Sequence, residues 1–261
     1  MTKKYAGVYP PLVERLLTEE GQRKDPQKAK AVKTKLHQIY GAYTQDNGHK
    51  KAAKLLDELA EENVTQTAKS LLALHASTKE RLPHYFEFYS FIQDHTGPIE
   101  SILDIGCGYN PFSIPLIPLI PLMPLDHNAE LKSYHAYDID TRVTELLNRF
   151  FTALGLPPLA ACADLALHTP QDSADIALIC KLIPVLEAQS PGSGFRLARG
   201  LNARYLLITY PLKSLGGREK GMAQNYTTTF ERALAQGELG RFMLMDKGQV
   251  GQEMLYMMKQ P

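Results

Sequence analysis

Two glycines one residue apart follow a short apolar run with an acidic residue, and this arrangement could hold a ligand against the backbone. The run is Ser101-Ile-Leu-Asp-Ile105, and Gly106-Cys107-Gly108 comes directly after it. Because glycine has no Cβ and adopts positive φ at little cost, the chain can turn sharply here and approach a ligand closely. The spacing predicts a strand and turn that bind a nucleoside-like ligand. A dinucleotide fingerprint needs a third glycine, and Tyr109-Asn-Pro111 stands there instead, which disfavours NAD and FAD.

Acidic residues follow the next two predicted strands. Asp138 ends the strand predicted over 133–137, and Asp164 lies near the end of a short strand predicted over 160–165. An acid after the second strand of such a sheet lies beside a nucleoside ribose, where a carboxylate accepts hydrogen bonds from both hydroxyls. We therefore assign Asp138 to the ribose. Asp164 is assigned to the adenine, and the alternative is that Asp164 caps a turn.

Cations follow the fourth and fifth predicted strands. Lys181 comes after the strand predicted over 174–180, at the edge where open α/β sheets bind ligands. The segment 211–222 follows the strand predicted over 205–210 and contains three glycines and three cations. These cations are Lys213, Arg218 and Lys220. A basic, glycine-rich segment suits contacts with phosphates, so we expect it to bind a nucleic-acid backbone.

The elements that must position these residues fall into two regions. Residues 10–96 are helix-forming, with breaks near 21–26 and 41–48, whereas strands and helices alternate after Pro98. Alternation of this kind is typical of an α/β sheet. We expect a helical domain over 1–97 and an α/β domain over 98–261, closed by a hairpin of strands at 241–246 and 253–259. The stretch 112–125 has a proline at every third position, which predicts an irregular apolar connection packed over the core rather than a first helix.

The charge of the chain is unevenly divided. Residues 1–54 contain 12 Lys and Arg against 5 Asp and Glu, whereas the remainder contains 17 against 23. A basic end favours a polyanionic partner such as nucleic acid, although a solvated helix face fits the same pattern. The cations that we expect to contact nucleic acid here are Arg15, Lys24, Lys28, Lys30, Lys33 and Lys35.

Cysteine usage and hydropathy indicate the cellular compartment. Cys107, Cys162 and Cys180 lack metal-ligand spacing, and three cysteines cannot all pair within one chain. We expect a reducing cytoplasm and no metal site. The polar N-terminus leads into no signal-peptide core, and the longest apolar run is short and interrupted by prolines. No membrane-embedded segment is predicted.

Four blocks of the sequence carry a resemblance to a known family. They are Leu74-His-Ala-Ser-Thr-Lys-Glu-Arg-Leu82, Asp104-Ile-Gly-Cys-Gly-Tyr-Asn-Pro111, Lys181-Leu-Ile-Pro-Val-Leu-Glu187 and Ser214-Leu-Gly-Gly-Arg-Glu-Lys-Gly-Met222. In this order they resemble the aminoglycoside-resistance 16S ribosomal RNA methyltransferases of the Arm/Rmt and producer-strain group. The resemblance extends from about Leu12 to Lys259. It implies a class I S-adenosylmethionine (SAM) methyltransferase, with a Rossmann-like sheet and an N-terminal all-helical domain.

The resemblance also implies a substrate and roles for single residues. The substrate would be guanine N7 in the decoding-site helix of the assembled 30S subunit. Near the cofactor carboxylate it puts His75 and Arg81, and against the methionine part it puts Gly106, Cys107 and Gly108. It adds the ribose role of Asp138, the adenine site of Asp164 and Leu165, and Lys181 beside the methyl group. Without the resemblance, Ser77 and Glu80 predict only a capping box at a helix start.

The target base must leave its stack, because N7 lies in a narrow RNA major groove. Tyr109 and Met222 are candidates to support it, with loop packing as the alternative for Tyr109. Guanine N7 carries a lone pair and no proton, so no general base is expected and placement supplies most of the rate. Two other functions stay open. One is a SAM methyltransferase acting on the nearby adenine N1 or on a small molecule, and the other is a catalytically silent ribosome-binding module. A monomer is expected.

Overall fold

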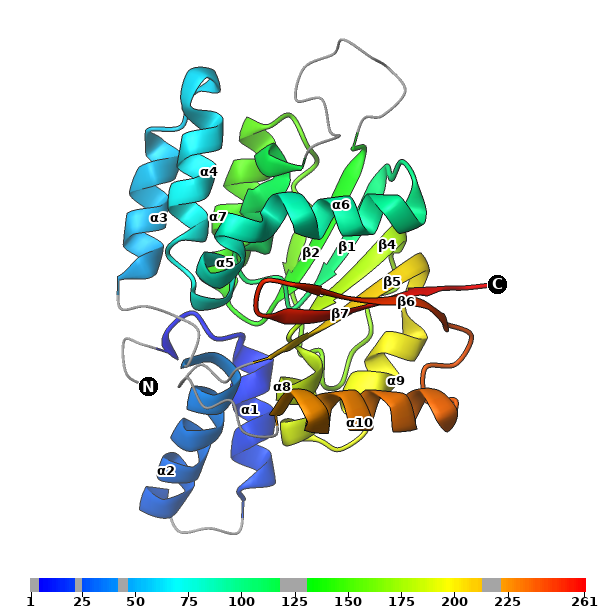
Figure 1. Cartoon of the computed structure of the whole chain (residues 1–261). Coiled ribbons are helices and arrows are strands. Elements are labelled where there is room, and N and C mark those ends of the chain that lie inside the picture. Colours follow the sequence, from blue (N-terminus) through cyan, green and yellow to red (C-terminus); the bar gives the residue numbers. More distant parts are fainter. Residues whose placement is uncertain (1–4, 22–24, 42–46, 118–130, 213–221) are drawn as a thin grey trace.

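The structure, a computed structural model, describes residues 5–21, 25–41, 47–117, 131–212 and 222–261 (Figure 1). Four of the predicted nucleic-acid contacts lie outside these ranges, namely Lys24, Lys213, Arg218 and Lys220. Most of the proline-rich stretch also lies outside, beginning at residue 118.

A seven-stranded sheet forms the centre of the described chain (Figure 1). Its spatial order is β3 (Ala160–Cys162), β2 (Ser133–Asp138), β1 (Ser101–Ile105), β4 (Ser173–Cys180), β5 (Asn202–Pro211), β7 (Glu253–Lys259) and β6 (Met243–Val250). The first five strands are parallel, and β7 pairs antiparallel with both β5 and β6. The predicted C-terminal hairpin is therefore confirmed. The parallel strands end at one edge, where Asp138 is the last residue of β2, and Gly106 and Lys181 follow β1 and β4.

Helices cover both faces of the sheet. One core contains Ile102, and its helices are α6 (Tyr85–Thr96) and α7 (Thr141–Ala153), with α3 (Gly48–Asp57) and α4 (Val64–Leu72) beside them. The other core contains Leu103, and its helices are α8 (Ile183–Gln189), α9 (Ser193–Gly200) and α10 (Met222–Ala235). Neighbouring strand residues point to opposite faces, so these apolar strands contribute to two cores at once. Helices α3, α4 and α6 thus share the core of the sheet.

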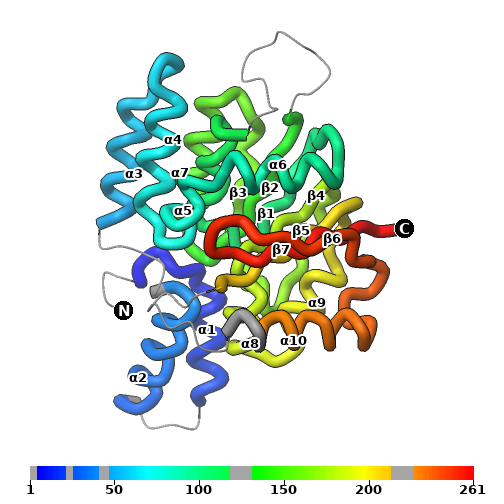
Figure 2. The backbone as a smooth tube through the Cα atoms, in the orientation of Figure 1, coloured from blue at the N-terminus to red at the C-terminus, as the bar shows by residue number. Residues whose placement is uncertain are grey.

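The first two helices form a separate unit beside the sheet edge (Figure 2). They are α1 (Pro10–Glu19) and α2 (Asp25–Leu36), which runs into a π-helical turn, η2 (His37–Gly41). Their own core contains Leu12, Leu16 and Leu36. The chain before α1 pairs with the turn after β2, where the Tyr9 amide donates to the Ile139 carbonyl at 2.8 Å. This pairing fixes the α1–α2 unit against the sheet edge that carries the predicted site.

Two short elements follow the most distinctive sequence blocks. Helix α5 (Ala76–Arg81) begins after His75, and a 3₁₀ turn, η4 (Leu82–His84), joins it to α6. The predicted capping box is wrong, because the Ser77 hydroxyl lies 3.0 Å from His75 Nδ1 and makes no bond to the helix end. After β1 the chain forms a 3₁₀ segment, η5 (Asn110–Leu116), in place of a full helix. Its prolines lack the amides that an α-helix needs, in agreement with the irregular connection predicted there.

Candidate active site

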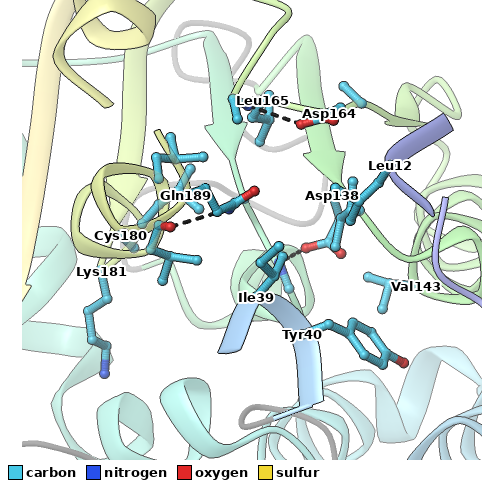
Figure 3. Close-up of a pocket in the computed structure, with 18 of the residues that line it drawn as sticks. Leu12, Ile39, Tyr40, Asp138, Val143, Asp164, Leu165, Cys180, Lys181 and Gln189 are labelled. Carbon is cyan, nitrogen blue, oxygen red and sulfur yellow. Dashed lines mark hydrogen bonds between the residues drawn. The ribbon is translucent and has the colours of Figure 1, made fainter. Parts of the chain in front are cut away.

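A cavity opens at the carboxyl edge of the parallel strands (Figure 3). It encloses about 850 Å³, including space open to solvent. The predicted cofactor residues that line it are His75, Gly106, Gly108, Asp138, Asp164, Leu165 and Lys181. The α1–α2 unit supplies a second wall, through Leu12, Ile39 and Tyr40. The cavity is therefore built between the sheet edge and the first helices.

The turn after β1 leaves room for a ligand because it contains glycine. Gly106 and Gly108 both have positive φ, +67° and +52°. A Cβ at Gly106 would lie 2.8 Å from the Leu182 side chain, and one at Gly108 would lie 3.2 Å from the His75 ring. Any larger residue would therefore strain the backbone and fill the cavity floor. Cys107 between them is buried, and its side chain is absent from the cavity lining.

Asp138 faces the cavity from the end of β2. Its two carboxylate oxygens accept backbone amides, Gly108 N at 2.8 Å and Asp140 N at 2.9 Å. Burial raises its pKa to about 6, against the lowering effect of these hydrogen bonds. The Ile139 amide also contacts this carboxylate, which has about four lone-pair sites and so keeps capacity for a ligand. The arrangement holds an acceptor in fixed orientation, as a pair of ribose hydroxyls would require.

Asp164 is buried, with 4% of its surface exposed, and forms an ion pair with Arg15 of helix α1. Arg15 Nε donates to its Oδ2 at 2.7 Å, and the Ala166 amide donates to its Oδ1 at 3.3 Å. The turn-capping alternative is thus seen in the structure, together with a position on the cavity wall. Arg15, expected to face nucleic acid, instead contacts Asp164, Glu19 and Gln189. A predicted RNA contact therefore belongs to the junction between α1 and the cavity.

His75 and Tyr109 form a stacked pair above the glycine turn. Their ring centroids are 5.5 Å apart at an interplanar angle of 25°. Burial, followed by the nearby charges of Lys181 and His49, lowers the pKa of His75 to about 4. At neutral pH this imidazole is uncharged. Tyr109 is 3% exposed, and its hydroxyl lies 3.4 Å from His49 Nδ1, which favours loop packing over contact with a target base.

Lys181 brings the cationic side chain to this wall. Its φ of +57° is unusual for a residue with a side chain, and its amide donates to the Thr209 carbonyl at 3.0 Å. Its ammonium nitrogen lies 2.9 Å from Glu80 and 3.4 Å from Glu253. Arg81 is 4% exposed and is absent from the cavity lining, because its guanidinium contacts Glu253 and Asn110.

The remaining predicted contacts lie on the α1–α2 unit and on α10. Lys30 and Lys33 are exposed on α2, and Lys28 is partly exposed. Lys35 forms ion pairs with Glu19 at 2.8 Å and Glu20 at 3.0 Å, and these two carboxylates offset its positive charge. Met222 begins α10, and its side chain lies outside the described part of the structure.

Sequence reasoning missed a polar junction centred on Asp140. This carboxylate caps α7 through the Arg142 amide at 2.9 Å and contacts Tyr40, His49 and the Arg142 side chain. Burial alone would raise the pKa of Asp140, but hydrogen bonds from His49, Arg142 and Tyr40 hold it well below its usual value. The junction joins η2, α3 and α7 behind the cavity. An acid just before a helix was the available signal, since Asp is a preferred N-cap.

The groups that line the cavity fit SAM. Paired acceptors for hydroxyls lie at the end of β2, a glycine cradle lies after β1, and the apolar side chains of Leu12, Leu165 and Val185 line its walls. Across the described ranges, no group of three His, Cys, Asp or Glu side chains could hold a metal ion. Within the same ranges, no helix is long and apolar enough to cross a membrane.

This sheet order, with a glycine turn and an acid opening onto one cavity, defines a SAM-dependent methyltransferase. Comparison with known proteins narrows the class. A family profile described as "Ribosomal RNA methyltransferase (FmrO)" matches residues 1–257, and the chain belongs to this family. The expected fold, enzyme class and cofactor are thereby confirmed.

Individual relatives match over almost their whole length. A Serratia marcescens protein named 16S rRNA (guanine(1405)-N(7))-methyltransferase is 35% identical over 99% of this chain and 94% of its own length. A Micromonospora rosea protein of the same name is 32% identical over 98% and 92%. The crystal structure of the 16S rRNA methyltransferase RmtF with S-adenosyl-L-homocysteine has a TM-score of 0.83 at 32% identity. It covers 100% of this chain and 94% of RmtF.

Proposed function

We propose that this chain methylates N7 of one guanine in the decoding-site helix of 16S rRNA, within the assembled 30S subunit, and so gives aminoglycoside resistance. The proposal rests on sequence identity of 35% and 32%, over almost the whole chain, with relatives named 16S rRNA (guanine(1405)-N(7))-methyltransferase. The enzyme acts as a monomer in the cytoplasm. The helices over 1–97 bind the subunit, and residues 98–261 bind the cofactor together with His75 and the α1–α2 unit, which also line the cavity.

The cavity residues divide along the length of the cofactor. Asp138 accepts the ribose hydroxyls, and Asp164 with Leu165 contacts the adenine. The glycine turn, His75 and Lys181 surround the methionine end. Support for this division comes from the order of the strand ends, since Asp138 and Asp164 follow β2 and β3 while Gly106 and Lys181 follow β1 and β4.

The reaction requires the protein mainly to position guanine N7 against the methyl group. Bound SAM supplies a methyl group on a sulfonium, an electrophile that guanine N7 can attack with its lone pair. No proton has to leave N7, so neither His75 nor an acid has to act as a base. His75 is neutral at pH 7, which adds no positive charge beside the sulfonium. Holding the two reacting atoms in line therefore supplies most of the rate.

Substrate binding is assigned to the exposed cations of helix α2. Lys30 and Lys33 lie on the α1–α2 unit, whose Leu12 and Tyr40 also line the cavity. Because the α1–α2 unit carries these cations and also lines the cavity, it can bring the ribosomal RNA backbone to the cavity mouth. Contacts of this kind with phosphates fix position more than sequence.

The test is transfer of a tritiated methyl group from SAM to purified 30S subunits and to protein-free 16S rRNA. We expect transfer to 30S subunits and much less to the free RNA. The variant K30E/K33E should raise the KM for subunits while the Kd for S-adenosylhomocysteine stays unchanged. K132E/K247E makes the same charge change elsewhere on the molecule and should leave both constants unchanged. Transfer to no RNA, with tight subunit binding, would instead indicate a silent ribosome-binding module.

A further inference from the structure

A buried ionic cluster lies behind the methionine end of the cavity, and its central residue is Glu253 at the start of β7. Glu253 is 3% exposed. Arg81 donates to it twice, from Nε at 3.0 Å and from a terminal nitrogen at 2.6 Å. The Thr209 hydroxyl donates to it at 2.7 Å, and the Lys181 ammonium lies 3.4 Å away. One carboxylate therefore joins α5, the residue after β4, β5 and β7.

The two cations of the cluster depend on this carboxylate. Arg81 is 4% exposed, and a buried guanidinium without a counter-ion is strongly destabilised. Burial favours the neutral form of Glu253, yet the charges of Arg81 and Lys181 lower its pKa. The carboxylate is thus ionised at neutral pH and forms a two-pronged pair with the guanidinium. Such pairs have a fixed geometry as well as a favourable energy.

Glu253 also determines how Lys181 is presented to the cavity. The Lys181 amide donates to the Thr209 carbonyl, and the Thr209 hydroxyl donates to Glu253. Its ammonium nitrogen lies between Glu253 and Glu80, and Glu80 is the more exposed of the two acids. An ammonium has three hydrogens, so one remains for a ligand after these two contacts. Both ends of this lysine are therefore positioned by the cluster.

A second branch of the cluster reaches the glycine turn. Arg81 donates to Asn110 Oδ1 at 2.8 Å, and Asn110 Nδ2 donates to Asp104 at 2.8 Å. Asp104 lies in β1, two residues before Gly106, and Asn110 begins η5, two residues after Gly108. The strand and the 3₁₀ segment on either side of the glycines are thus joined through Arg81 to Glu253.

We propose that Glu253 is a positioning residue for the amino-acid part of the cofactor, acting through Lys181 and Arg81. The inference rests on the proposed function of the cavity. Glu253 lies outside the cavity lining, so its effect on a ligand is indirect. Its removal should therefore weaken contacts with the carboxylate and amine of the cofactor and leave the adenosine end unchanged. This selectivity separates a positioning role from a general structural one.

The test compares two ligands that differ only at that end. Calorimetry measures the Kd of S-adenosylhomocysteine, and the Kd of 5′-methylthioadenosine, which keeps the adenosine thioether and lacks the amino-acid group. For E253Q we expect the Kd of S-adenosylhomocysteine to rise by about tenfold or more, which corresponds to the loss of one charged contact. The Kd of 5′-methylthioadenosine should rise by less than about threefold. E253D retains the charge and should restore part of the loss.

A matched control and a second variant complete the test. Glu187 accepts the Gly192 and Gly194 amides at 2.7 and 2.9 Å outside the cavity lining, so E187Q makes the same chemical change elsewhere. It should lower the melting temperature and leave both Kd values unchanged. If E253Q fails to fold, K181M should show the same selective loss.

Two results would overturn the inference. One is wild-type affinity for S-adenosylhomocysteine in E253Q or, where that variant does not fold, in K181M. The other is an equal loss of affinity for both ligands. If the wild-type chain binds neither ligand, the proposed function of the cavity fails, and this inference fails with it.

Discussion

Protonation of Asp138 should control the pH dependence of cofactor affinity. Under the proposed function the carboxylate accepts ribose hydroxyls in its ionised form, and burial raises its pKa to about 6 in the ligand-free protein. At pH 5 roughly nine in ten carboxylates would be protonated, and at pH 8 almost none. Affinity for S-adenosylhomocysteine should therefore fall as pH decreases through 6, by roughly tenfold between pH 8 and pH 5.

The variant D138N should remove that dependence and weaken binding at every pH. Losing a hydrogen bond to a charged group costs about 1.5–3 kcal/mol, which corresponds to a rise in Kd of roughly 10- to 150-fold. The assay is calorimetry of S-adenosylhomocysteine binding at half-unit steps from pH 5 to pH 8. His75 does not titrate in this range, because its pKa is about 4.

Asp104 is the necessary control, since burial raises its pKa to about 6 as well. D104N should keep the pH dependence of the wild type. The reasoning is refuted if the wild-type Kd is constant over this range, or if the dependence survives in D138N and disappears in D104N.

Three further predictions concern the turn, the junction and the core. G106A should weaken cofactor binding, because its Cβ would lie 2.8 Å from the Leu182 methyl groups and displace a side chain that lines the cavity. G155A has a similar φ of +71° in open space and should cost only about 1–2 kcal/mol of stability; equal affinity in both variants would contradict this. D140A should lower the free energy of unfolding in urea by at least about 2 kcal/mol at pH 7 through loss of the cap and of charged hydrogen bonds. Since the pKa of Asp140 is depressed in the folded chain, its stabilisation is fully present above its unfolded pKa of about 4 and is lost progressively as pH falls from there toward the depressed folded value; an unchanged difference at pH 3 would refute this. F150A should cost about 3–5 kcal/mol, because Phe150 is fully buried, and a melting temperature equal to the wild type would contradict the packing described here.

Local patterns predicted the parts of the site that lie at strand ends. Gly106, Gly108, Asp138 and Lys181 each follow a short apolar strand, and parallel strands bring their carboxyl ends to one edge. The strands could be predicted because their apolar residues stand in short runs bounded by turn residues. For the same reason the C-terminal hairpin was correctly predicted.

Contacts between distant residues could not be predicted in this way. Arg15 and Asp164 are 149 positions apart, and Arg81 and Glu253 are 172 apart. No local periodicity relates such pairs. From the sequence, Arg15 was expected to contact nucleic acid, and the resemblance placed Arg81 near the cofactor carboxylate. The π-helical turn that brings Tyr40 to the cavity also has no clear sequence signal. The wall supplied by the α1–α2 unit therefore emerged only from the fold.

The most direct measurement of the central claim is chemical mapping of the modified nucleotide. Purified 30S subunits are incubated with the protein and SAM, and their 16S rRNA is then treated with borohydride and aniline, which break the strand at N7-methylguanine. We predict one new break, at a guanine of the decoding-site helix, that requires both the protein and SAM. Methyl transfer without a break at that guanine would contradict the account and point to another atom, such as adenine N1.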